Sequence, residues 1–157
     1  MDKIAIILYG NIRYDGRVQK EIASLKKKGK KVILFCSDFD KDDSKENYNF
    51  EIEVIKDRIN KRGAFYTFLN LIEFQKEILK KLENMKVQYI HCNDLNTLIM
   101  AKKLSKFGKI IYDAHELFPE SQENKIKRVI WNLIEKINIK YAYKIIQPEH
   151  NRKKIFF

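Results

Sequence analysis

The stretch KIAIILYGNIRYDGRVQKEIASLKKKGKKVILFCS, residues 3–37, decides the fold because it places a helix between two buried strands. Residues 3–9 and 31–37 are short, continuous apolar runs, which are typical of strands covered on both faces of a sheet. Residues 16–28 repeat apolar side chains every three or four positions, with Asp15 as the predicted N-cap, and therefore indicate a helix. Two such strands joined by a helix predict a parallel βαβ unit.

The same alternation of strands and helices continues along the chain. Residues 38–49 are polar and acidic without an apolar period, so we expect an exposed loop there. Apolar patterns predict the remaining strands at residues 50–55, 87–92, 109–114 and 144–147, and the remaining helices at residues 64–85, 94–106 and 125–143. The fold class is therefore α/β: a Rossmann-like open, mainly parallel sheet with helices on both faces. In such sheets, ligands bind beyond the carboxyl ends of the strands.

Length, charge and cysteine content narrow the class of protein. The chain has 157 residues, enough for one domain, and a net charge of +11. Its lysines are spread over the whole chain, with no recognition helix or basic–aromatic motif, so we expect no nucleic acid partner. We find no signal peptide pattern and no run approaching about 20 apolar residues. Cys36 and Cys92 lie in apolar strands, which fits a reducing cytoplasm, and no residues have the spacing of a metal site.

The first candidate loop, GNIRYDG at residues 10–16, joins a strand to a helix N-terminus. Free N–H groups and the helix dipole allow such a junction to bind an anion, and glycine at both ends permits a close approach. An ordinary turn capped by Asp15 explains the same residues, and the loop matches neither a Walker nor a dinucleotide motif. Arg17 and Glu21 are four residues apart, so a surface ion pair on the helix accounts for both.

Two further loops follow predicted strands. In the segment HCND, we expect Asp94 to cap the next helix and His91 to be packed and hydrogen-bonded rather than catalytic, while Asn93 is a candidate to face a cleft. In the segment YDAHELFPE, His115 stands just after a strand, where ligand contact is common. A loop histidine bonded to its neighbours explains His115 equally well. These residues alone establish a Rossmann-like domain with an edge suited to anions.

Three segments together resemble family 4 glycosyltransferases. Residues 15–21 (DGRVQKE) are similar to an Asp-x-Arg-Val-x-Lys/Arg-Glu stretch that opens the first helix of that family. Residues 89–98 (YIHCNDLNTL) resemble its His-x-His-Asp-Leu segment, with Asn93 where the family often has a second histidine. Residues 111–120 (IYDAHELFPE) resemble its Tyr-Asp-x-His-Glu segment most closely. The resemblance extends from the first residue to about residue 146.

The resemblance implies one half of a two-domain GT-B enzyme that transfers a sugar with retention of anomeric configuration and without a metal. The N-terminal domain would hold a polysaccharide or lipid-linked acceptor, and a nucleotide-sugar would be the donor substrate, with no cofactor. His115 would be the catalytic residue, orienting and electrostatically supporting the departing diphosphate. The substrate-binding residues that the resemblance implies are Gly10, Asn11, Arg13, Asp15, Gly16, Arg17, Asn93, Asp94 and Glu116.

The end of the chain departs from the family pattern. We expect residues 1–147 to form the N-terminal domain and residues 148–157 to be an atypical basic and apolar tail, with the donor-binding domain absent. Such a piece is expected to be inactive alone. An incomplete two-domain enzyme exposes an apolar cleft face, so we expect a separate donor-domain chain or self-association as its partner.

Membrane contact is a further expectation. The basic surface and the aromatic-rich helix at residues 64–85 suit an anionic membrane or a lipid-linked acceptor, which implies a cytoplasmic protein on the inner face of the membrane. Ordinary core packing explains Phe65, Phe68 and Phe74 as well. The alternative to an enzyme is a non-catalytic, flavodoxin-like module that binds a phosphorylated small ligand at the same edge.

Overall fold

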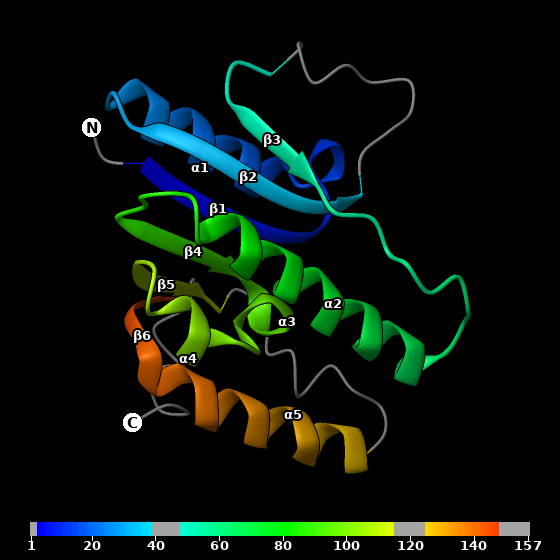
Figure 1. Cartoon of the computed structure of the whole chain (residues 1–157). Helices are drawn as coiled ribbons and strands as arrows, with labels where there is room; N and C mark the ends of the chain where they lie inside the picture. Colours follow the sequence, from blue (N-terminus) through cyan, green and yellow to red (C-terminus); the bar gives the residue numbers. More distant parts are fainter. Residues whose placement is uncertain (1–2, 39–47, 115–124, 148–157) are drawn as a thin grey trace.

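A six-stranded sheet organises the structure (Figure 1). The computed structural model describes residues 3–38, 48–114 and 125–147. All neighbouring strands are parallel, in the order β3-β2-β1-β4-β5-β6. The strands are β1 (Lys3–Asn11), β2 (Lys31–Asp38), β3 (Glu51–Val54), β4 (Tyr89–Asn93), β5 (Lys109–Asp113) and β6 (Ala142–Ile146). The predicted Rossmann-like parallel sheet is therefore confirmed.

Helices cover the two faces of the sheet unequally, with α1 on one face and α2 to α5 on the other (Figure 1). Alternate residues of β1 serve the two layers, because successive side chains of a strand point to opposite faces. Ile4 and Ile6 pack with Val18 of α1, whereas Ala5 and Ile7 belong to the opposite layer. The helices are α1 (Gly16–Lys27), α2 (Ala64–Leu82), α3 (Asp94–Leu98), α4 (Ala101–Leu104) and α5 (Lys125–Asn138), with 3-10 turns η1 (Ile12–Tyr14) and η3 (Ile139–Tyr141).

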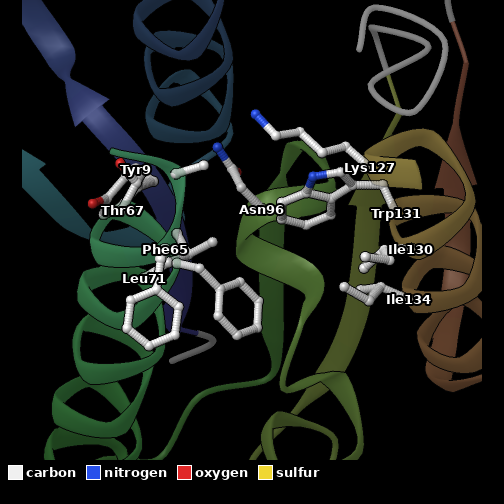
Figure 2. A pocket seen from close by; sticks show the side chains of 11 residues that line it. Tyr9, Phe65, Thr67, Leu71, Asn96, Lys127, Ile130, Trp131 and Ile134 are labelled. Carbon is white, nitrogen blue, oxygen red and sulfur yellow. The ribbon is translucent and has the colours of Figure 1, made fainter. Parts of the chain in front are cut away.

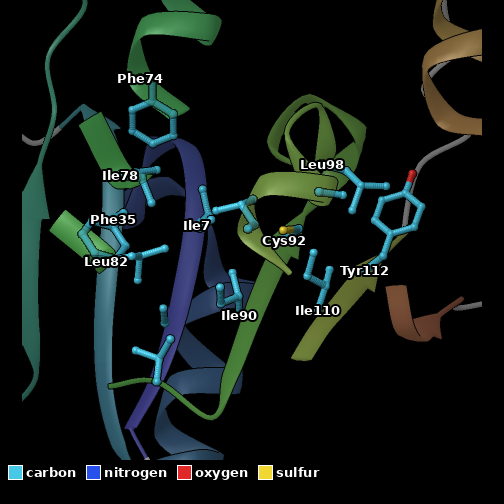
Figure 3. Close-up of a cluster of buried hydrophobic side chains, with 14 of the residues drawn as sticks. Ile7, Phe35, Phe74, Ile78, Leu82, Ile90, Cys92, Leu98, Ile110 and Tyr112 are labelled. Carbon is cyan, nitrogen blue, oxygen red and sulfur yellow. The ribbon is translucent and has the colours of Figure 1, made fainter. Parts of the chain in front are cut away.

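The larger core layer lies between the sheet and α2 to α5 (Figure 3). Phe74, Ile78 and Leu82 of α2 are each at most 2% exposed. They form one cluster with Ile7 and Phe35 of the sheet. Full burial of one such side chain contributes about 1.5–3 kcal/mol, so these three side chains of α2 contribute substantially to the stability of the layer.

The predicted helix over residues 94–106 is interrupted, and the side chain of Gln75 explains the break. In a continuous helix, the Met100 N–H would donate to the Asn96 carbonyl. Here Met100 N donates to Gln75 Oε1 at 2.9 Å, and Gln75 Nε2 donates to the Asn96 carbonyl at 2.7 Å. This buried amide is inserted into the helical ladder and divides it into α3 and α4.

Other element ends also differ from the prediction. Asp94 does not cap α3: Asn93 holds the extended N-cap position, and Asp94 is the first helical residue. The helix predicted to reach residue 143 ends at Asn138, whose side-chain Nδ2 donates to the carbonyl of Ile134 at 2.9 Å. A 3-10 turn follows, so β6 begins at Ala142 rather than at residue 144.

Two glycines are required by the backbone. Gly29 ends α1 with a φ of 73°, in the left-handed region that favours glycine, as the sequence predicted. Gly108 precedes β5, and a Cβ there would lie 3.2 Å from the carbonyl oxygen of Val87 and 3.3 Å from that of Gln88. Glycine therefore lets the chain enter β5 directly against the segment that leads into β4.

Candidate functional site

The connections of the sheet change direction between β1 and β4. The chain leaves β1 toward α1 on one face and leaves β4 toward α3 on the opposite face. The two strands pair directly, with Ile7 opposite Cys92. In open α/β sheets, such a switch point opens a crevice at the carboxyl ends of the strands, where ligands bind. The first two loops selected from the sequence therefore meet at this crevice.

Arg17 of α1 joins three carboxylates there, and we name Arg17, Asp15, Asp94 and Asp113 the Arg17 cluster. Arg17 Nη1 donates to Asp113 Oδ2 at 3.2 Å. Arg17 Nη2 lies 3.4 Å from Asp15 Oδ2 and 4.0 Å from Asp94 Oδ2. The Asp113 side chain is 10% exposed and that of Arg17 is 36% exposed, so water screens these pairs only in part. One guanidinium among three carboxylates leaves the cluster net negative.

The carboxylate of Asp15 caps α1, as predicted. Its Oδ1 accepts from Val18 N at 3.0 Å, while its Oδ2 faces Arg17. Asn11 Oδ1 accepts in the same way from Arg13 N at 2.9 Å. A protein carboxylate thus already occupies the position in which this helix N-terminus would hold an anion. The edge consequently suits neutral hydroxyl groups better than a phosphate.

Asp94 and Asn93 are held firmly at the end of β4. Asp94 has a φ of 66°, a left-handed conformation that is uncommon outside glycine and often found at functional sites. The Thr97 hydroxyl donates to the carbonyls of Asn93 and Asp94, at 2.8 and 3.1 Å. Asn93 is 1% exposed and its Nδ2 donates to the Ile7 carbonyl at 3.2 Å, while its Oδ1 is buried without a hydrogen-bond partner among the described residues. Asn93 therefore fixes β4 against β1 instead of lying in the open crevice.

The remaining selected residues are placed differently. Gly10 and Asn11 belong to β1, which extends to Asn11 where the sequence predicted an end at residue 9. Arg13 is exposed in η1, and Gly16 begins α1 with open space where a Cβ would stand. His115 and Glu116 lie outside the residues that the structure describes, so their roles stay predictions.

Sequence reasoning missed Asp113 as a member of the site. The residue ends β5 and is 7% exposed, yet its carboxylate reaches Arg17 from a position 96 residues away. The available signal was a carboxylate at the carboxyl end of a buried strand, two positions before the candidate His115.

The predicted ion pair between Arg17 and Glu21 is wrong. Glu21 Oε1 instead contacts Nδ1 of His91, which is 4% exposed in β4. A helix-surface pair contributes only about 0.2–0.5 kcal/mol, so tertiary partners outweigh it easily. The prediction that His91 is packed and paired is confirmed, although its Nε2 is buried without a hydrogen-bond partner among the described residues.

The chemistry available at this edge is hydrogen bonding and charge. Within the described ranges, no group of three or more His, Cys, Asp or Glu side chains is arranged to hold a metal ion. Cys36 and Cys92 are both buried. Burial raises the pKa of the Cys92 thiol to about 12, so it stays protonated at neutral pH.

An apolar cavity of about 550 Å³ opens between α2 and α5 (Figure 2). Phe68 and Trp131 meet there edge to face, with ring centroids 6.4 Å apart. Core packing explains Phe74, which is 2% exposed, but not Phe65, which is 68% exposed. The cavity is lined by Tyr9, Ala64, Phe65, Thr67, Phe68, Leu71, Asn96, Lys127, Ile130, Trp131 and Ile134.

This strand order, with candidate ligand groups at the switch point, is that of the Rossmann-like half of a GT-B glycosyltransferase. Residues 6–149 match the model of the glycosyl transferase 4-like family, and the chain belongs to that family. Comparison with curated protein sequences finds no match.

Solved structures share the fold at low sequence identity. Sucrose-phosphate synthase from Thermosynechococcus elongatus is 14% identical with a TM-score of 0.73, and the match covers 99% of this chain and 44% of the synthase chain. The lipopolysaccharide outer core galactosyltransferase WaaB, in its apo form, is 16% identical with a TM-score of 0.57, and the match covers 90% of this chain and 38% of the WaaB chain. MurG from Acinetobacter baumannii is 13% identical with a TM-score of 0.55, and the match covers 94% of this chain and 41% of the MurG chain. The chain thus spans less than half the length of each of these proteins.

Proposed function

We propose that this chain is the acceptor-side half of a glycosyltransferase that moves a sugar from a nucleotide-sugar to a polysaccharide or lipid-linked acceptor. The observation that carries the proposal is the Arg17 cluster at the switch point. Carboxylates accept hydrogen bonds from hydroxyl groups, and charge-assisted bonds of this kind are stronger than neutral ones. A sugar hydroxyl group is therefore a suitable ligand for the net negative crevice.

The same charge argues that the donor's diphosphate binds chiefly elsewhere. Three carboxylates against one guanidinium disfavour a phosphate at this edge. In the proposed enzyme, a second domain holds most of the nucleotide-sugar, and this chain presents the acceptor hydroxyl to it. His115, which follows β5 in the sequence, supports the departing diphosphate, and transfer proceeds with retention and without a metal or cofactor.

Peripheral contact with an anionic membrane on the cytoplasmic side belongs to the same proposal. Of the helices in the described ranges, none is long and apolar enough to cross a membrane. Instead, α5 exposes a row of large apolar side chains, and basic side chains border them. This combination suits the interface of an anionic bilayer. The exposed apolar residues of α5 are Ile126, Val129, Ile130, Leu133 and Ile137.

Amide chemical shifts of the ¹⁵N-labelled chain test where ligands bind. We expect glycan and sugar-phosphate probes at millimolar concentration to shift the amides of Gly10, Gly16, Arg17 and Asp94. The amide of Gly108, at the opposite end of β5, is the internal control. A soluble oligosaccharide should cause larger shifts at the Arg17 cluster than UDP does. Larger shifts with UDP, or shifts confined to the Gly108 end, would instead favour a phosphate-binding module and contradict an acceptor site.

A further inference from the structure

We propose that the cavity between α2 and α5 binds the long hydrocarbon chain of an amphipathic acceptor whose head group is anionic. This inference rests on the proposed function, because it assigns a substrate class to the acceptor. The cavity has a volume of about 550 Å³, which lies within the roughly 300–1,000 Å³ of typical small-molecule sites. Most of its lining is apolar, so the part of the ligand that fills it is apolar as well.

The walls of the cavity are large side chains that the fold leaves open to water. Phe65 is 68% exposed, Ile130 is 51% exposed and Phe68 is 37% exposed. Phe68 and Trp131 form the aromatic contact between α2 and α5, so the cavity lies between two helices that already touch. Monomeric proteins rarely leave such an apolar concavity uncovered without a ligand or partner.

One end of the cavity is polar, which gives the ligand a direction. Asn96 Oδ1 is buried and has no hydrogen-bond partner among the described residues, so a ligand hydroxyl or amide can donate to it. Lys127 supplies a positive charge, and none of the lining residues within the described ranges is acidic. Figure 2 shows Lys127 and Asn96 reaching toward the same end of the cavity, away from Ile134.

The charges of α5 favour an anionic head group over a neutral one. Lys125, Lys127 and Arg128 are all exposed in the first turns of the helix. Glu135 is the one acidic residue of the helix, and it is buried, accepting a hydrogen bond from the Tyr112 hydroxyl at 2.7 Å. The described exposed side chains in the first turns of α5 thus include three basic ones, one of which lines the cavity, and such side chains attract a phosphate or diphosphate head group.

The polar end also lies on the side of the crevice. Asn96 follows two residues after Asp94, a member of the Arg17 cluster, and Tyr9 lines the cavity from the carboxyl-terminal part of β1. A chain seated between Phe65, Phe68 and Trp131 thus leaves its anionic head group beside Lys127 and directs the sugar beyond it toward the edge where the acceptor hydroxyl reacts. The occupant is accordingly a single amphiphile, with its chain in the cavity and its sugar at the crevice.

Fluorescence provides a direct test, because Trp131 is the single tryptophan of the chain. Dodecyl phosphate, kept below its micelle concentration, should give a saturable blue shift with half-saturation at micromolar concentration. Inorganic phosphate at the same concentration should give none, and dodecyl glucoside should bind several-fold more weakly. A linear response, or an equal response to inorganic phosphate, would overturn the proposal.

Two variants make the test specific to the cavity. Ala64→Phe adds a ring at the lining of the cavity and should weaken dodecyl phosphate binding at least tenfold. Ser24→Phe adds the same ring at an exposed position of α1 and should leave binding unchanged. Both variants should keep the circular dichroism spectrum and the urea midpoint of the parent. Equal binding by Ala64→Phe and Ser24→Phe would overturn the assignment of the site.

Vesicle binding and sugar transfer distinguish a chain-binding cavity from a membrane-docking face. If Trp131 responds to vesicles of anionic phospholipid but not to monomeric dodecyl phosphate, the surface is a membrane-docking face and the chain-binding site is refuted. Sugar transfer to a soluble oligosaccharide by the enzyme, with no amphiphile bound, would refute the cavity while leaving the transferase function in place. Amphiphile binding, together with no transfer to any acceptor by the chain joined to a donor-binding domain that binds its nucleotide-sugar, would support the cavity and contradict the transferase function.

Discussion

Replacing Arg17 with alanine should destabilise the fold more than any exposed ion pair does. The substitution removes the one guanidinium that lies 3.2, 3.4 and 4.0 Å from three carboxylates. Removing one partner of a fully buried pair costs about 3–5 kcal/mol, because an uncompensated charge remains. Since the Arg17 side chain is 36% exposed, water compensates part of this loss, and we expect about 2 kcal/mol.

Urea unfolding at neutral pH, followed by circular dichroism, measures this free energy. Arg58→Ala is the matched control: its guanidinium lies 3.2 Å from Glu77 Oε1, but the Arg58 side chain is 66% exposed, so the loss should stay below about 1 kcal/mol. A double-mutant cycle with Asp113→Asn should show a coupling energy of about 1 kcal/mol or more for the pair with Arg17. Equal losses for Arg17→Ala and Arg58→Ala, or a coupling near zero, would refute the view that the Arg17 cluster is a shielded unit.

Three further predictions concern the core. Tyr112→Phe removes a buried 2.7 Å hydrogen bond to Glu135 and should cost about 1–3 kcal/mol in urea unfolding, whereas a loss near zero would show that the bond is dispensable. Burial raises the pKa of Glu135 above its ordinary 4.5, so the stabilising contribution of Glu135 is present below pH 4.5 and is lost as the pH rises. The stability of Glu135→Gln relative to the parent protein should therefore increase between pH 4.5 and 7. Parallel plots of unfolding free energy against pH for the two proteins would contradict this. Gly108→Ala places a Cβ 3.2 Å from the Val87 carbonyl and should lower the unfolding free energy by about 1–3 kcal/mol, while the control Gly16→Ala, with no atom within 4 Å, should be neutral or stabilising.

The sheet could be predicted from the sequence because each of its buried strands is a continuous apolar run that is recognisable locally. Ile6 and Ile7 of β1 and Ile33 of β2 are all fully buried, and only continuous apolar runs satisfy a sheet with both faces covered. Asp15 and Gly29 marked the ends of α1 correctly, because a cap and a left-handed residue depend on the local backbone.

The sequence-based predictions that were wrong concern features that depend on contacts between distant segments. The break between α3 and α4 comes from Gln75, whose amide arrives from another helix and leaves no trace in the local periodicity. Arg17 pairs with Asp113, 96 residues away, instead of with the neighbouring Glu21, and this contact between distant segments is likewise invisible in the local sequence. The exposure of Phe65 was equally hidden, since an apolar helix residue looks alike whether it faces the core or a ligand cavity.

Sugar transfer by the chain with and without a donor-binding domain tests the central claim most directly. A panel of nucleotide-sugars would be assayed with soluble oligosaccharide and lipid-linked acceptors, using the 157-residue chain alone and residues 1–147 joined to a donor-binding domain of the same family. We predict transfer with retained anomeric configuration by the joined protein and no turnover by the chain alone. Turnover by the chain alone, or a folded joined protein that binds its donor yet transfers to no acceptor, would contradict the assignment of this chain as the acceptor-side half.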